Sequence, residues 1–367
     1  MAPSAIQATA PSFDGFTTPK HMQLAATPVV FDPAKHLNYS PPASTISMDE
    51  LHLPSTAIST VGSTQPFSLL SHEAVIEHRR ELFSKPVLEN CLHHTRPGSV
   101  QLRGMAPRYA PFIHQFWSSL EVLKIVSEIA GVEVVPVVDY EIAHTNVQLG
   151  PGGLDAARDT PIEPPEATRE AISALQENRS EQGGGNGNPS IIEWHHDSHP
   201  FVCVVMLSDA RYMTGGETVL KTGTGETLPV KAPQMGSAVI LQGRYINHMA
   251  LPAQNLPERI TIVTSFRPKD PKLVDDSSLV NIRNKSQLSE IYYQWTRYRL
   301  RNLAKRINGL VDDLDAKYAW NIEKTDSDKK RGFCKADTVD VLDLEKWSKL
   351  QIDFLQKTLY EMRPLGQ

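Results

Sequence analysis

Five short apolar segments follow one another between residues 191 and 268, and no helical pattern lies between them. They cover residues 191–195, 201–207, 218–221, 237–241 and 259–266. Turn residues separate them, among them Gly215-Gly216 and the glycines Gly223 and Gly225. Short strands joined directly by such turns are typical of a β-sandwich or barrel. Residues 132–149 are rich in Val and Ile and predict one or two further strands, so we expect a β core over about 132–268.

Apolar residues at helical spacing predict helices on both sides of this core. These helices cover about 71–91 and 118–130, then 287–310 and 343–362, so that helical flanks extend over 71–130 and 280–362. A short helix near 166–178 and a glycine-rich loop at 181–189 interrupt the core. Residues 1–65 are rich in Pro, Ser, Thr and Ala and predict an irregular N-terminal arm, followed by one domain over 66–367. The predicted fold class is a mainly β core with flanking helices.

The charge balance excludes some partners and is silent about others. With 37 Lys+Arg against 42 Asp+Glu and a formal net charge of −5, we expect no nucleic-acid partner and no binding to an anionic membrane. The longest apolar run, residues 201–207, is too short to span a bilayer. Cys91, Cys203 and Cys334 lie far apart without a CxxC pair, and the N-terminus shows no basic segment followed by an apolar one. We therefore expect a cytoplasmic protein.

A His-x-Asp motif ends the first of the five segments. Alternate side chains of an extended chain point the same way, so His195 and Asp197 share one side while His196 faces the other. His248 follows about fifty residues later. Two imidazoles and one carboxylate on one face of an iron ion leave three positions for other ligands. The sequence therefore predicts a catalytic metal site made of His195, Asp197 and His248.

A cation follows the predicted metal ligands. Arg259 lies eleven residues after His248 at the start of an apolar segment, and Thr261 points to the same face of that strand. The guanidinium fork pairs with a carboxylate in bidentate fashion, so we expect Arg259 to anchor an acidic cosubstrate with help from Thr261. Asn146 and Gln148 share a face of an earlier strand and are further candidates for contact with cosubstrate or substrate, or ordinary polar strand residues.

Together these residues resemble a known family. The pattern is His195-x-Asp197, a Gly-Gly-Glu-Thr turn, a glycine before an apolar strand, His248 and Arg259. Over about residues 132–268 it resembles the iron(II)/2-oxoglutarate-dependent oxygenases. The resemblance implies a double-stranded β-helix (jelly-roll) fold, with iron(II), 2-oxoglutarate as cosubstrate and O₂. It also implies that the far carboxylate of 2-oxoglutarate meets Arg259.

The flanking helices are similar to those of the phytanoyl-CoA-hydroxylase-like branch found in fungal secondary metabolism. Within that branch the chain most resembles oxygenases that form an aziridine ring on L-valine. This resemblance implies a small aliphatic amino acid as substrate and oxidative C–N ring closure to an aziridine carboxylic acid. Hydroxylation or desaturation of another small metabolite is the alternative within the same class.

The last predicted helix could close over the mouth of the barrel. In that case Ile352 or Phe354 would contact a branched aliphatic substrate, whereas core packing explains the same apolar stripe without a substrate. The amphipathic tail could also form a homodimer. A free amino acid needs a partner for its carboxylate, and the candidates are Arg103, Arg244 and Arg267.

Other interpretations of these residues stay open at the level of sequence. His195, His196 and His199 could hold zinc, although no cysteine and no His-Glu-x-x-His helix supports such a site. Arg259 could form an ordinary strand-end ion pair. Arg267, on the same face but 19 residues after His248, competes with Arg259 for the role of anchor. Glu217 in the Gly-Gly turn is expected to be a solvated turn residue. The alternative from another class is a non-catalytic jelly-roll module that binds a small molecule or a protein.

Overall fold

The computed structural model describes residues 28–363 with several gaps. The gaps are residues 163–191, 231–233 and 255–257 and the single positions 57, 97, 151, 161, 212, 327, 329 and 331. The short helix predicted near 166–178 and the glycine-rich loop at 181–189 therefore lie outside the described residues. Within the described part, no helix is long and apolar enough to cross a membrane.

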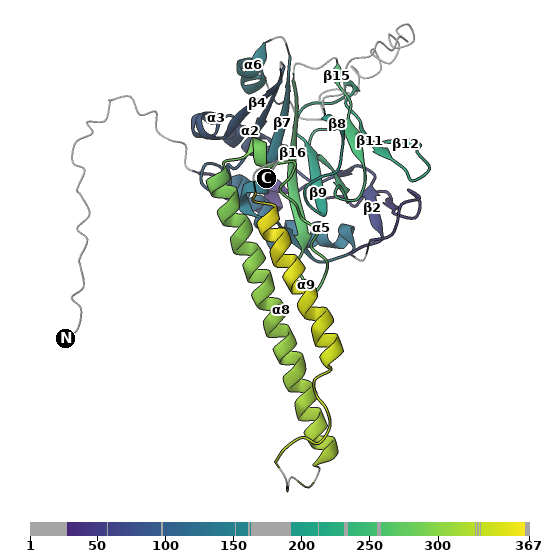
Figure 1. The fold of residues 1–367 in the computed structure, drawn as a ribbon. Coiled ribbons are helices and arrows are strands. Elements are labelled where there is room, and N and C mark those ends of the chain that lie inside the picture. Colours follow the sequence, from purple (N-terminus) through teal and green to yellow (C-terminus); the bar gives the residue numbers. More distant parts are fainter. Residues whose placement is uncertain are drawn as a thin grey trace, which may run out of the picture.

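Two antiparallel sheets form the β core (Figure 1). The larger sheet has the order β1 (Thr45–Ser47), β2 (Val61–Thr64), β13 (Ser237–Leu241), β9 (Phe201–Met206), β16 (Glu258–Pro268), β7 (His144–Leu149), β5 (Ser99–Leu102) and β4 (Leu92–Arg96). Two further strands join it, β3 (Phe67–Ser68) beside β13 and β6 (Val134–Pro136) beside β16. The smaller sheet has the order β12 (Thr227–Val230), β11 (Thr218–Lys221), β14 (His248–Ala250) and β8 (Ile192–His195). A separate ribbon pairs β10 (Thr214–Gly215) with β15 (Ala253–Gln254).

The chain alternates between the two sheets, as in a jelly roll. It passes from β8 in the smaller sheet to β9 in the larger one and returns to the smaller sheet for β11 and β12. It then enters the larger sheet for β13, the smaller sheet for β14 and the larger sheet again for β16. An apolar layer joins the sheets, with Val202 and Leu241 from the larger sheet packed near Leu220 and Val230 from the smaller one. The predicted mainly β core with a jelly-roll fold is confirmed.

Helices cover the other face of the larger sheet. They are α2 (His72–Leu82), α3 (Lys85–Cys91), α4 (Pro111–Ser118) and α5 (Leu120–Ala130). Their apolar side chains, such as Phe112 and Trp117, share one buried cluster with Ile260 and Ile262 of β16. Because side chains alternate along a strand, burying Ile260 and Ile262 under the helices turns Arg259 and Thr261 toward the space between the sheets.

Helix ends follow the capping signals in the sequence. The Ser71 hydroxyl accepts a hydrogen bond from the backbone N–H of Ala74 at 3.1 Å and begins α2. Gly131 ends α5 in the left-handed conformation, at a φ of 70°. Two shorter helices, α1 (Pro33–His36) and α6 (Gly153–Asp159), and the 3-10 turns η1 (Asp139–Glu141) and η4 (Arg283–Lys285) complete this part of the molecule.

A long helical hairpin projects from the β core (Figure 1). It consists of α8 (Leu288–Thr325) and α9 (Val341–Tyr360), which run antiparallel. The hairpin is held at its base by buried polar contacts: the Trp295 indole donates to the carbonyl of Thr358 at 3.1 Å, and Arg299 donates to the carbonyl of Phe354 at 3.1 Å.

The structure differs from the sequence predictions at both ends. Residues 28–65 are not an irregular arm, because they form α1, β1 and β2 and place Met48 and Leu51 in the core between the sheets. Strands of three or four residues are too short to show a period of two, which hid them in the sequence. Helix α8 continues to Thr325, beyond the predicted end near residue 310: Asn308-Gly309 is typical of a helix end, but the helix continues through it and no proline follows before Thr325.

Candidate metal centre

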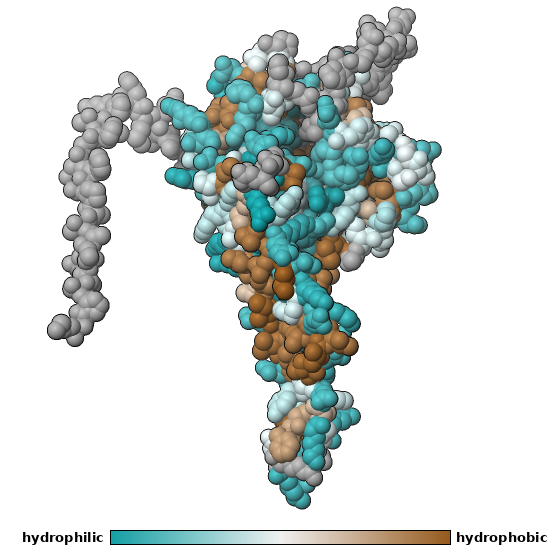
Figure 2. All heavy atoms as spheres, in the orientation of Figure 1, coloured by the Kyte–Doolittle hydropathy of each residue, from teal (hydrophilic) through white to brown (hydrophobic). Residues whose placement is uncertain are grey.

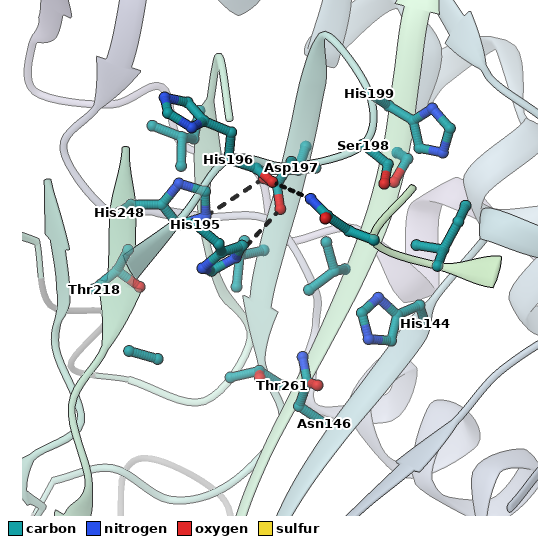
Figure 3. Close-up of a pocket in the computed structure, with 18 of the residues that line it drawn as sticks. His144, Asn146, His195, His196, Asp197, Ser198, His199, Thr218, His248 and Thr261 are labelled. Atoms are coloured by element: carbon teal, nitrogen blue, oxygen red, sulfur yellow. Dashed lines mark hydrogen bonds and ion pairs between the residues drawn. The ribbon is translucent and has the colours of Figure 1, made fainter. Parts of the chain in front are cut away.

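The three predicted metal ligands come together at one edge of the smaller sheet (Figure 3). His195 ends β8 and His248 begins β14, and these two residues are direct partners in the antiparallel register. Their imidazole rings therefore lie side by side, with centroids 4.3 Å apart. Asp197 lies 3.6 Å from Nε2 of His195 and 3.5 Å from Nε2 of His248. One donor atom from each residue falls within 4.8 Å of the others, close enough to hold a single ion.

Backbone carbonyls orient both imidazoles. Nδ1 of His195 donates to the carbonyl of Glu193 at 2.8 Å, and Nδ1 of His248 donates to the carbonyl of Ile246 at 2.9 Å. Because a carbonyl only accepts hydrogen bonds, each Nδ1 carries the proton and each Nε2 presents its lone pair toward Asp197. This arrangement of a fixed tautomer behind each metal-facing nitrogen is typical of metal-binding histidines.

Asp197 is held in its charged form. Burial alone would raise its pKa, but the electrostatic influence of the neighbouring His248 and His195 outweighs burial and lowers the pKa to about 2. Its Oδ2 atom is buried and accepts no hydrogen bond within the described part of the chain. An unsatisfied carboxylate oxygen beside two imidazole lone pairs fits a divalent metal with nitrogen and oxygen ligands, such as iron(II).

Gly243 fixes the position of Asp197. The backbone N–H of Asp197 donates to the carbonyl of Gly243 at 2.8 Å, and a Cβ atom on Gly243 would lie only 1.8 Å from Oδ2 of Asp197. No other residue fits at this position while the ligand keeps its place. Sequence reasoning missed Gly243, because one glycine between two strands looks like an ordinary turn residue.

A cavity of about 410 Å³ opens from the metal ligands between the two sheets. Arg259 and Thr261 of β16 line it, as the alternation along that strand predicts. Arg259 is nearly fully buried, and burial lowers its pKa to about 10, so it stays charged at neutral pH. It donates to the carbonyl of Gly216 at 3.1 Å. The structure thus brings Arg259 and Thr261 to the same cavity as His195, Asp197 and His248.

The Gly215-Gly216 turn supports Arg259. Both glycines have a φ of 74°, and a Cβ on Gly215 would approach the carbonyl of Pro252 to 2.3 Å. The turn can therefore press its backbone against the neighbouring chain and present the Gly216 carbonyl to the guanidinium. Glu217, expected to be a solvated turn residue, adds an electrostatic interaction that favours the charged form of Arg259.

A second polar group lines the opposite side of the cavity (Figure 3). Arg103 and Glu141 form a fully buried ion pair there, and Nε2 of His199 lies 3.8 Å from Glu141. Burial lowers the pKa of both His144 and His199, so each is neutral at physiological pH. Nε2 of His144, both ring nitrogens of His199 and Nε of Arg103 have no hydrogen-bond partner within the described chain. These atoms can bind a polar ligand.

Two predicted cosubstrate residues have structural partners. Asn146 lines the cavity, but its Oδ1 accepts a hydrogen bond from Gln101 at 2.7 Å. Gln148 lies outside the cavity, where its amide donates to the carbonyl of Ala253 at 2.7 Å and accepts from the N–H of Ala253 at 3.1 Å. Gln148 therefore ties β15 to β7, and the structure does not bring it to the site.

The predicted substrate residues on α9 do not reach the cavity. Ile352 points to solvent, and Phe354 packs under the guanidinium groups of Arg299 and Arg306, whose Cζ atoms lie 3.4 and 4.2 Å from its ring centre. Of the two alternatives for α9, core packing describes Phe354, because α9 pairs with α8 and Phe354 packs against that helix.

Two of the three candidate arginines for a substrate carboxylate lie elsewhere as well. Arg267 extends past the end of the cavity and stacks on Tyr298, with Cζ 5.0 Å from the ring centre. Arg244 faces Asp276 at 3.7 Å. Arg103 is the candidate that lines the cavity.

The alternative zinc set is not assembled. His199 lies across the cavity beside Glu141, while His196 points away from the two metal-facing imidazoles (Figure 3). Among the described residues, the one group with metal-binding spacing is His195, Asp197 and His248.

Comparisons with known proteins add structural likeness at low identity. No protein-family model matches the chain, and no curated protein matches it. One similar solved structure is a prolyl-4-hydroxylase from Pseudomonas putida, 16% identical over 65% of this chain and 96% of that one, with a TM-score of 0.31. Another is AviO1 from Streptomyces viridochromogenes Tue57, 14% identical over 63% and 99%, with a TM-score of 0.35. A third is a 2OG-Fe(II) oxygenase family oxidoreductase from Burkholderia pseudomallei, 13% identical over 46% and 67%, with a TM-score of 0.30. Likeness at this level carries no argument about activity, so function is argued from the site.

Proposed function

We propose that the chain is an iron(II)/2-oxoglutarate-dependent oxygenase that oxidises a small molecule. The observation that carries this proposal is one cavity lined both by the His195, Asp197 and His248 cluster and by the buried cation of Arg259. Three protein ligands on one side of a metal leave room for a bidentate cosubstrate and for O₂. A buried guanidinium in the same cavity suits a cosubstrate with a second carboxylate.

Iron(II) would be held by Nε2 of His195, the carboxylate of Asp197 and Nε2 of His248. When bound together with 2-oxoglutarate and O₂, it supplies an oxidant able to remove hydrogen from an unactivated C–H bond. The chain contributes binding and orientation: Arg259 and Thr261 fix the far carboxylate of 2-oxoglutarate, which sets the direction from which its other end reaches the metal site.

Part of the cavity wall between the two sheets is apolar. Val202, Val204 and Val263 line it between the two polar groups. An apolar wall suits the aliphatic part of a substrate and keeps solvent away from the reacting C–H bond.

For the substrate we propose a small aliphatic amino acid such as L-valine, in the setting of fungal secondary metabolism. The support is the family resemblance of the sequence together with the polar group opposite Arg259. Arg103 and Glu141 offer one buried charge of each sign, which matches a zwitterion. The unsatisfied ring nitrogens of His144 and His199 add hydrogen-bonding positions for its ends.

The proposed outcome is oxidative C–N ring closure. The substrate loses one C–H and one N–H hydrogen and gains a C–N bond, while 2-oxoglutarate and O₂ become succinate, CO₂ and water. Hydroxylation would instead leave one oxygen atom in the product, and desaturation would form a C=C bond. The three cysteines are free thiols, which agrees with a reducing compartment such as the cytoplasm.

Succinate release tests the reaction class. Purified protein with iron(II), 2-oxoglutarate and a panel of amino acids should release succinate, and His248→Ala should abolish it. His114→Ala is the matched control, because His114 lies on α4 and pairs with Asp139 rather than lining the cavity. An absence of succinate over a broad panel, or turnover that survives His248→Ala, would overturn the proposal.

Mass spectrometry of products from deuterium-labelled valine tests the outcome. A product two hydrogens lighter without added oxygen indicates ring closure or desaturation, and NMR of the isolated product separates these two. A product one oxygen heavier indicates hydroxylation and contradicts ring closure while leaving the reaction class intact.

A further inference from the structure

Helix α8 carries an apolar stripe that does not contact α9. Its residues recur mainly at alternating steps of four and three: Tyr293, Leu300, Ala304, Ile307, Val311, Leu314 and Tyr318. The large side chains Tyr293, Leu300, Ile307, Val311 and Tyr318 are between 44% and 62% exposed. Alternating steps of four and three are the heptad spacing of a helix that packs along a second helix.

Helix α9 carries a matching stripe. It consists of Val341, Leu344, Ser348, Ile352, Leu355 and Leu359, again at steps of three and four. Its five large apolar residues are between 36% and 72% exposed. Each helix of the hairpin therefore presents apolar residues both to its partner and to solvent.

The two stripes lie on the same side of the hairpin. On α8, the stripe residues Leu300 and Ile307 each follow an arginine that contacts α9, Arg299 or Arg306. On α9, the stripe residues Ile352 and Leu355 each follow a residue that contacts α8, Gln351 or Phe354. One residue is a rotation of about 100°. Because the helices run in opposite directions, the same rotation turns both stripes toward the same side. Figure 2 shows hydrophobic residues gathered along the hairpin on the side that faces the viewer.

The side of the hairpin that carries both stripes is about as large as a protein–protein interface needs. From Tyr293 to Tyr318 it extends about 37 Å at about 1.5 Å per residue, and two packed helices are about 20 Å wide, which gives about 750 Å². Stable interfaces bury about 800 Å² per partner, and monomers rarely expose apolar patches above a few hundred Å².

Charges beside the face favour a second copy of the same chain. Along the outer edge of α8, Arg301 lies near the β core and Asp315 lies farther out, each one residue after a member of the stripe. Neither of these two residues forms an ion pair within the described chain. If two hairpins pack face to face and antiparallel, the basic part of one edge lies against the acidic part of the other. Parallel pairing of this edge would place like charges together.

We propose that two copies of this chain dimerise through the apolar face of α8 and α9 and form an antiparallel four-helix bundle. In one copy, α8 and α9 leave an apolar side exposed. The same two helices of a second copy would cover that side and form a core of the kind found in four-helix bundles. A twofold axis across the face makes the interface self-complementary in both shape and charge.

Sedimentation of the full chain at micromolar concentration tests the proposal. The wild-type chain should sediment at twice its 40.8 kDa mass. The double variant Ile307→Glu with Ile352→Glu should sediment as a monomer, because it places charges at the middle of the face. Leu350→Glu is the matched control, since Leu350 is an equally exposed leucine of α9 that lies about 200° around the helix from Ile352. Circular dichroism verifies that all three proteins keep their helices.

A charge exchange tests the antiparallel arrangement. Arg301→Asp should weaken association by about tenfold or more, and adding Asp315→Lys should restore it. A monomeric wild-type chain, a dimer that survives the Ile307 and Ile352 changes, or a charge exchange without rescue would each overturn the proposal in the form stated. Flotation of a monomeric wild-type chain with phosphatidylcholine–phosphatidylserine vesicles would assign the face to a lipid surface instead.

Discussion

Replacement of Arg259 with Leu tests the cosubstrate site directly. Arg259 is only 7% exposed, and its Nε atom has no hydrogen-bond partner within the described chain. Within the described chain, Nη2 of Arg259 donates to the carbonyl of Gly216 at 3.1 Å. A buried guanidinium with so few partners is destabilised by desolvation, which is why its pKa falls to about 10. A carboxylate of the cosubstrate would provide a counter-charge in direct contact with the guanidinium.

The expected cost follows from this burial. Removing one partner of a buried, hydrogen-bonded charge pair costs about 2–5 kcal/mol, which corresponds to roughly 30- to 5000-fold in affinity. We therefore expect Arg259→Leu to raise the KM for 2-oxoglutarate by at least about 30-fold. Arg259→Lys keeps the charge but loses the bidentate guanidinium, so its KM for 2-oxoglutarate should lie between those of the wild type and Arg259→Leu.

The assay is succinate release at increasing 2-oxoglutarate concentration, with manganese(II) binding measured separately by EPR. Arg267→Leu is the matched control: it lies on the same strand but stacks on Tyr298 outside the cavity. Arg259→Leu with normal metal binding and a KM within about threefold of wild type would refute the assignment of the anchor.

Three further changes test other parts of the structure. Gly243→Ala should abolish metal binding in a folded protein, because the new Cβ would displace the Asp197 carboxylate, and metal content measured after dialysis would show this. Acidification from about pH 7 to 5 should release the metal, since protons compete for the imidazoles. Burial lowers the pKa of His195, but the neighbouring Asp197 outweighs burial and raises it, so His195 is protonated first. Burial lowers the pKa of His248, so His248 is protonated at lower pH. Asp197, with a pKa of about 2, stays charged throughout. Metal retained below about pH 4 would contradict this order. Phe354→Ala should lower the free energy of unfolding by about 3 kcal/mol without changing the KM of the substrate, as denaturant titration and succinate assays can show.

The sequence predicts what is local and alternating. Strand parity places His195 and Asp197 on one side, and Arg259 with Thr261 on one face, because both follow from a period of two. It could not place Phe354, because helical spacing identifies an apolar stripe without identifying the surface that covers it. The same limit applies to Gln148, because its amide donates to the backbone carbonyl of Ala253, which is distant in sequence.

Glycines explain how the distant parts of the site are held together. Gly243 lets one backbone segment lie against Asp197, and Gly216, in a turn with positive φ, brings its carbonyl to Arg259. At each position a side chain would occupy space that the neighbouring group already fills. The metal end and the anion end are thus positioned by backbone contacts, which restrict where Asp197 and Arg259 can move. A cavity whose two ends are positioned in advance reduces the entropy lost when 2-oxoglutarate binds. The interactions at the two ends can then orient the cosubstrate for reaction.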